Sequence, residues 1–143
     1  MESVQLTLRH DLAFVTATLT YRGTTVSVPG VLVDTGAAST VINADLAADA
    51  GIFLEPGDKL RTLRGVGGRE YVFVRDVDRL AIGENGLDGF EVEIGALDYG
   101  LEIGGILGMD FLRATGAVVD LDRLTIEFRR QASPDEAVSI RPG

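Results

Sequence analysis

Apolar residues alternate with polar ones over most of the chain, which is the pattern of β-strands with one buried face. The segment VQLTL (residues 4–8) alternates, and residues 12–34 fit two strands joined by a turn near Arg22-Gly23. Residues 59–83 fit two further strands that meet at a glycine-rich tip. We therefore expect a mainly β fold, and further strand-like segments follow at residues 89–100 and 117–128, the latter with a turn near Asp122-Arg123.

Helical patterns are confined to two short segments. In NADLAADAG (residues 43–51), Asn43 is suited to cap the N-terminus of a helix and Gly51 is suited to end it. The segment MDFLRATG (residues 109–116) fits a second short helix that ends at Gly116. One or two short helices therefore accompany the strands.

The size and composition of the chain fit a single domain. It has 143 residues, of which 45% are hydrophobic, and it shows no internal repeat and no domain-sized linker. We expect the folded domain to span residues 1–128 and the polar residues 129–143 to form a C-terminal tail.

The charge and the apolar runs limit the binding partners. A formal net charge of -9 disfavours nucleic acids and anionic membranes, because both require a positive surface. No apolar run reaches the length of about 18 residues typical of a membrane span, and the N-terminus lacks the layout of a signal peptide. The chain has no cysteine, which excludes disulfides and thiolate metal sites. We expect a soluble cytoplasmic protein without metal or cofactor, and the soluble domain of a longer, membrane-anchored protein remains an open alternative.

One carboxylate lies between two apolar runs, in VLVDTGAASTVI at residues 31–42. Asp34 follows the apolar strand GVLV, and a carboxylate at the end of a buried strand requires hydrogen bonds or a paired group. The small residues after it allow backbone N–H groups to approach. For Asp-Thr-Gly taken alone, an aspartate that merely caps a turn is the better explanation.

Two further segments are distinguished by their glycines. In GGILGMDFL (residues 104–112), Gly108 lacks a side chain and so allows another chain segment to approach closely. In RGVGGREYVFV (residues 64–74), the residues 65–68 form the tip of a hairpin. This tip is not a phosphate-binding loop, because no Lys-Ser/Thr follows and the next element is a strand. Taken singly, the two segments also fit a core strand that meets a helix and an ordinary hairpin turn.

Together and in this order, the three segments resemble the retropepsin-like aspartic peptidases, the single-lobe relatives of pepsin that include retroviral proteases and cellular or bacterial homologues. The resemblance covers roughly residues 12–128. Residues 32–42 resemble the catalytic loop, residues 64–74 the flap, and residues 105–112 the apolar-apolar-Gly segment with its helix. It implies an acid-protease barrel of closed β-hairpins, with one lobe per chain.

The resemblance also assigns roles to residues. It implies that Asp34 is the catalytic carboxylate and that Thr35 and Gly36 form its supporting loop. The residues expected to line the substrate follow the loop, form the flap tip or belong to the apolar segment: Ala37, Ala38, Gly65, Val66, Gly67, Gly68, Ile106 and Leu107.

An aspartic peptidase needs two carboxylates about 3 Å apart, which share one proton and activate water. This chain is too short for two lobes and contains no second Asp-Thr-Gly or Asp-Ser-Gly motif. We therefore predict a homodimeric aspartic endopeptidase in which two copies of Asp34 face each other and act on a polypeptide substrate. A non-catalytic peptide-binding or dimerisation module with the same fold is the alternative, and the intact Asp34-Thr35-Gly36 motif counts against it.

The sequence departs from the retroviral pattern at two positions that usually form an ion pair. Retroviral enzymes carry an acidic residue where this chain has Ala38 and an arginine where it has Met109. Because both partners are absent together, we expect another packing solution between the two segments. The single histidine, His10, has no catalytic partner in any motif, and we expect it at the surface or in an interface.

Overall fold

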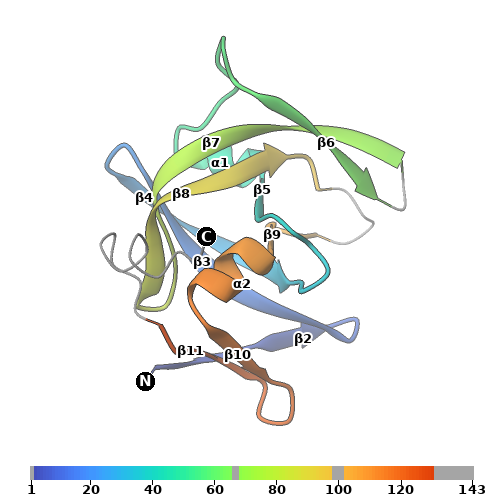
Figure 1. Cartoon of the computed structure of the whole chain (residues 1–143), viewed down its shortest axis with the longest axis vertical. Coiled ribbons are helices and arrows are strands. Elements are labelled where there is room, and N and C mark those ends of the chain that lie inside the picture. The colour runs from blue at the N-terminus through green and yellow to red at the C-terminus, as the bar shows by residue number, and fades with distance from the viewer. Residues whose placement is uncertain (1, 66–67, 98–101, 131–143) are drawn as a thin grey trace, which may run out of the picture.

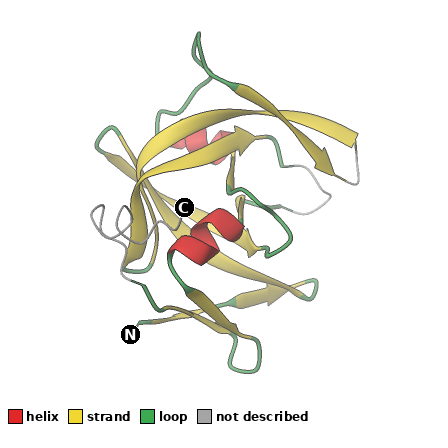
Figure 2. Cartoon of the chain, viewed as in Figure 1, coloured by secondary structure: helices red, strands yellow, loops and turns green. Residues whose placement is uncertain are grey.

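The computed structural model describes residues 2–65, 68–97 and 102–130. This part of the chain is mainly β-structure with two short helices (Figure 2), so the predicted fold class is confirmed. In chain order the elements are β1 (Ser3–Gln5), β2 (Thr7–Arg9), β3 (Leu12–Tyr21), β4 (Thr24–Val33), β5 (Val41–Asn43), α1 (Ala44–Asp49), β6 (Leu60–Gly65), β7 (Gly68–Ile82), β8 (Asn85–Gly95), β9 (Gly105–Leu107), α2 (Met109–Ala114), β10 (Ala117–Asp120) and β11 (Thr125–Phe128).

Eight strands form one sheet in the order β2-β3-β4-β9-β5-β8-β7-β6. Strand β3 also pairs with β7, from Thr18 opposite Ala81 to Thr20 opposite Arg79. This additional pairing closes the strands from β3 to β7 in that order into a barrel, as predicted (Figure 1). Most neighbours are antiparallel, but β9 runs parallel to β4 and β5 runs parallel to β8.

The N-terminal strand belongs to two sheets. Its first half, β1, pairs with β11 in a small sheet of order β1-β11-β10, and its second half, β2, pairs with β3. Leu6 lies between the halves, is buried, and donates its N–H to the carbonyl oxygen of Leu124 (2.8 Å). The segment predicted as a single strand therefore links the barrel to the small sheet.

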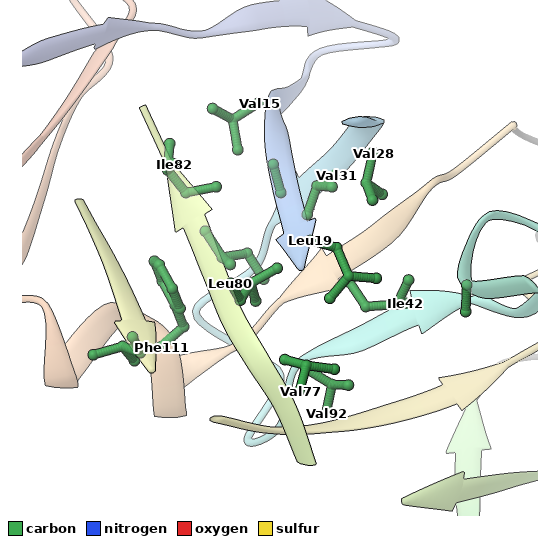
Figure 3. Close-up of a cluster of buried hydrophobic side chains, with 14 of the residues drawn as sticks. Val15, Leu19, Val28, Val31, Ile42, Val77, Leu80, Ile82, Val92 and Phe111 are labelled. Atoms are coloured by element: carbon green, nitrogen blue, oxygen red, sulfur yellow. The ribbon is translucent and has the colours of Figure 1, made fainter. Parts of the chain in front are cut away.

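The inside of the barrel holds the main core. Side chains from β3, β4, β5, β7, β8 and α2 meet there (Figure 3). Because side chains alternate along a strand, the intervening residues lie on the outer face of the barrel sheet. A second, smaller apolar cluster packs on that outer face: Phe14, Val41, Val72, Leu97 and Ile103.

Both predicted helices are present. The side chain of Asn43 accepts a hydrogen bond from the N–H of Asp45 (2.9 Å), so Asn43 caps α1. Gly51 and Gly116 follow α1 and α2 with φ of +86° and +62°, a conformation that glycine adopts without strain. Among the described residues, no helix is both long and apolar enough to cross a membrane.

Two segments differ in detail from the sequence pattern. Strand β8 begins at Asn85, although the glycine-rich residues before 89 read as a loop, because residues 85–88 continue the pairing with β7. At the C-terminus, the N–H groups of Arg129 and Arg130 bond the carbonyl oxygens of Gly116 and Thr115 (both 3.0 Å). Residues 131–143, most of the predicted tail, lie outside the described residues.

Candidate active site

Asp34 lies directly after β4, in the turn that leads to β5. Its N–H donates to the carbonyl oxygen of Leu107 (3.1 Å), which extends the pairing of β4 with β9 by one residue. Its Oδ1 accepts a hydrogen bond from the N–H of Gly36 (2.9 Å), and its carbonyl oxygen accepts one from Ala37 (3.2 Å). A Cβ at Gly36 would lie 3.1 Å from Oδ1, so a side chain there would press on the carboxylate. The turn therefore fixes one carboxylate oxygen of a half-buried aspartate.

The segment from β9 to α2 crosses directly against this loop. Met109 donates its N–H to the carbonyl oxygen of Ala37 (2.8 Å), and Asp110 donates its N–H to that of Ala38 (3.2 Å). A Cβ at Gly108 would collide with the carbonyl oxygen of Ser39. The close backbone approach predicted at Gly108 is confirmed.

A buried threonine and a carboxylate join the two segments. Thr40 is 0% exposed, and its hydroxyl donates to Asp110 Oδ1 (2.7 Å) and accepts from the N–H of Gly108 (3.1 Å). The N–H of Thr40 donates to Asp110 Oδ2 (3.2 Å), and the N–H of Phe111 donates to Asp110 Oδ1 (2.7 Å). Both oxygens of Asp110 are thus hydrogen-bonded within the chain, and they hold the Asp34 loop against α2.

The sequence pattern does not single out Thr40 or Asp110. An acidic residue in the first turn of a helix is common on general electrostatic grounds. Ala38 and Met109, which replace the two residues of the retroviral ion pair, lie at the same junction. The two segments are joined there by backbone hydrogen bonds and, in addition, by the side-chain hydrogen bond between Thr40 and Asp110. The expected alternative packing is therefore present.

Two of the residues predicted to line the substrate, Ile106 and Leu107, point to opposite faces of β9. Ile106 is half-buried and packs with the outer cluster, where it lies opposite Leu32 of β4 and Val41 of β5. Leu107 is 0% exposed and belongs to the main core, so its side chain lines no surface. Its contribution is the carbonyl oxygen that holds the N–H of Asp34. Leu32, which the sequence pattern leaves unnoticed, takes the place beside Ile106.

The glycine-rich hairpin lies on the same side of the molecule as the Asp34 loop. Strands β6 and β7 pair as far as Gly65 opposite Gly68. Figure 1 shows the end of this hairpin and the loop after β4 on one side of the barrel, at the right of the view. Val66 and Gly67, at the predicted flap tip, lie outside the described residues. Hydrogen bonds join the Asp34 loop to the segment at Gly108, and the described end of the hairpin lies on the same side of the barrel in this view.

A single copy of the chain leaves the Asp34 loop open. Thr35, Gly36 and Ala38 are exposed, while Ala37 is half-buried. The groove of about 740 Å³ near β2 and the start of α1 includes Arg9 and Phe14, and Asp34 is not among its lining residues. One half-buried carboxylate on an open loop can orient and deprotonate water, and the described residues place no second aspartate of an Asp-Thr-Gly motif beside it.

Comparison with known proteins identifies the family. No curated protein matches the sequence significantly. The sequence model of a family described as aspartyl protease matches residues 15–111, more than half of the 143 residues. The matched span contains the Asp34 loop, the β6–β7 hairpin and the crossing at Gly108. The chain therefore belongs to the aspartyl protease family, in its retropepsin-like clan.

Proposed function

We propose that the protein is an aspartic endopeptidase that acts as a homodimer, with one Asp34 from each copy at the site. Membership of the aspartyl protease family supports a protease-like function. The surroundings of Asp34 support the proposal of a dimeric site. One oxygen of its carboxylate accepts a hydrogen bond from Gly36, and the neighbouring residues Thr35 and Gly36 are exposed. A second copy packed on this open side supplies the second carboxylate.

The chemistry follows from two carboxylates that share one proton. The ionised Asp34 takes a proton from water as the water oxygen bonds to the scissile carbonyl carbon, and the protonated Asp34 donates its proton to the carbonyl oxygen. The product of this step is a tetrahedral intermediate with two hydroxyl groups. As its C–N bond breaks, the Asp34 that took the water proton gives it to the leaving amine, and the other Asp34 takes a proton back from one hydroxyl, which becomes part of the new carboxyl group. Leu32 and Ile106 offer apolar surface for substrate side chains, and the glycine-rich hairpin covers the extended peptide.

The test is the substitution Asp34→Asn. The amide keeps the shape of the side chain but cannot take a proton from water, so hydrolysis should fall by about 10²-fold or more. A peptide library digested at acidic and neutral pH, with mass-spectrometric detection, measures the loss. Asp122→Asn, in the exposed turn between β10 and β11, is the matched control and should keep the parent rate.

A rate for Asp34→Asn close to that of the parent would exclude Asp34 as the catalyst. A folded parent protein that binds library peptides but cleaves none would instead indicate the non-catalytic binding module.

A further inference from the structure

The strand registers place one charged side chain in an otherwise apolar row on the outer face of the barrel sheet. Phe14 of β3 lies opposite Leu32 of β4, Leu32 opposite Ile106 of β9, and Ile106 opposite Val41 of β5. Val41 in turn lies opposite Glu93 of β8. Directly paired residues share a face of a sheet, so these five residues form one row, which we call the floor row.

Asp34 lies on the same face as the floor row. The hydrogen bond from its N–H to Leu107 carries the extended pairing past the end of β4. The two-residue period of a strand then places the side chain of Asp34 on the side of Leu32. Glu93 is three strand positions from β4, which corresponds to about 14 Å at the usual strand spacing.

Glu93 is buried without full hydrogen bonding. Only 4% of the residue is exposed, and Oε1 has no hydrogen-bond partner among the described residues. Its other oxygen, Oε2, lies 3.3 Å from Nη1 of Arg61. Burial of a carboxylate oxygen without a donor is unfavourable, so the site lacks one donor.

The resident cation does not neutralise the cluster. The same Nη1 of Arg61 also contacts Glu91 Oε2 (3.2 Å), so a single cation serves two carboxylates. The hydrogen bond that Arg61 donates to Glu93, and then the charge of Glu91, raise the pKa of Arg61 above its ordinary value, so it remains a cation. Its side chain is 42% exposed and makes both contacts through the one nitrogen Nη1.

We propose that Glu93 is a specificity-determining residue that selects a lysine or arginine side chain of the bound peptide. The proposal rests on the proposed peptidase function. The cationic group of the substrate enters beside Arg61 as that exposed side chain shifts, and donates to Oε1 of Glu93. Asp34 lies two residues, or about 7 Å, past Leu32, so its separation from Glu93 is about 16 Å. An extended peptide advances about 3.4 Å per residue, so the selected residue lies within about five positions of the cleaved bond.

The first arm of the test measures cleavage. A synthetic random octapeptide library is digested with the parent, with Glu93→Gln and with Glu91→Gln, and the products are sequenced by mass spectrometry. The parent should enrich Lys or Arg at one fixed position and should cleave the best peptide about tenfold faster, in kcat/KM, than its Lys-to-Met analogue. Glu93→Gln should reduce the difference in kcat/KM between the two peptides to about twofold. The control Glu91→Gln, whose side chain is exposed, should keep the preference for the Lys peptide.

A purely structural role of Glu93 gives a different result. The variant would then cleave both peptides more slowly by the same factor. The second variant, Arg61→Gln, separates the two roles even if Glu93→Gln does not fold. Removal of the resident cation should increase the preference for the Lys peptide, whereas loss of a structural ion pair would leave the preference unchanged.

The second arm measures binding and does not require catalysis. Immobilised Asp34→Asn protein is incubated with the same library, and the retained peptides are identified. Enrichment of Lys and Arg that disappears in the Asp34→Asn, Glu93→Gln double variant supports the inference even if no peptide is ever cleaved. Absence of that enrichment, or its persistence without Glu93, overturns the inference and leaves the proposed peptidase function standing.

Discussion

Two carboxylates lie on the two segments that cross at Gly108, and their surroundings differ. Asp110 accepts hydrogen bonds from the N–H and hydroxyl of Thr40 and from the N–H of Phe111. Asp34, among the described contacts, accepts one from Gly36 on a single oxygen. A carboxylate with both oxygens satisfied holds structure, whereas one with a free oxygen can still take up a proton, a water or a second carboxylate.

Replacing each carboxylate in turn should separate the structural role from the catalytic role. Of the substitutions predicted here, these two should change stability and hydrolysis the most. Asp110→Ala removes the acceptor for three donors and should lower the free energy of unfolding by about 3 kcal/mol. Asp34→Asn should change it by less than about 0.5 kcal/mol while hydrolysis is lost. Urea unfolding and peptide hydrolysis, measured on both variants, test the contrast. Parent-like stability of Asp110→Ala would show that the junction does not depend on this carboxylate.

A substitution in the β6–β7 hairpin tests whether substrate binds on the open side of Asp34. Gly68→Val restricts the backbone beside the tip of the hairpin. It should reduce turnover several-fold, because the hairpin must move to cover the substrate, and should change thermal stability little. Ser27→Val, on an exposed part of β4 that pairs with Thr18, is the matched control. Equal kinetics of Gly68→Val and the control would make the hairpin an ordinary turn.

The carboxylate of Asp58 extends the comparison to the pH dependence of stability, where we expect the smallest effect. Asp58 Oδ2 accepts from the N–H of Glu55 and from Arg75 Nη2 (both 2.6 Å). The hydrogen bond from Glu55 lowers the pKa of Asp58 below its ordinary value, burial acts in the opposite direction, and Arg75 lowers the pKa further. A folded pKa below the unfolded one contributes stability above about pH 4, and this contribution disappears as the pH falls through the folded pKa.

Urea unfolding of the parent and of Asp58→Asn between pH 6 and pH 3 measures this contribution. The parent should be the more stable of the two at pH 6, and the difference should narrow as the pH falls below about 4. A difference that stays constant over this range would contradict the assigned role of Asp58.

The sequence predicts the parts of the site that depend on local chemistry. The structure shows the hydrogen bond from Gly36 to Asp34, the close approach at Gly108 and the cap at Asn43, each defined by residues adjacent in the chain. The catalytic role of Asp34 stays a prediction. Strand alternation also predicts the β-rich class, because one buried face gives a two-residue period.

The remaining features depend on pairing between distant strands. The row that joins Leu32, Ile106, Val41 and Glu93 exists only through the registers of β4, β9, β5 and β8, which no local pattern encodes. Leu107 illustrates the same limit, because a period of two assigns it to one face of β9 but does not say which face meets the core. The start of β8 at Asn85 is hidden by its glycine and acidic residues, which are typical of loops.

A subunit-mixing experiment tests directly whether each site needs two copies of Asp34. Parent and Asp34→Asn proteins are mixed in equal amounts and allowed to exchange fully, so that about one quarter of the dimers carry two aspartates. An amide cannot share the proton that the remaining carboxylate must take and give, so mixed dimers should be nearly inactive. We predict that activity falls to about a quarter of that of the same total concentration of parent protein. Retention of about half the activity, the value for independent sites, would contradict it.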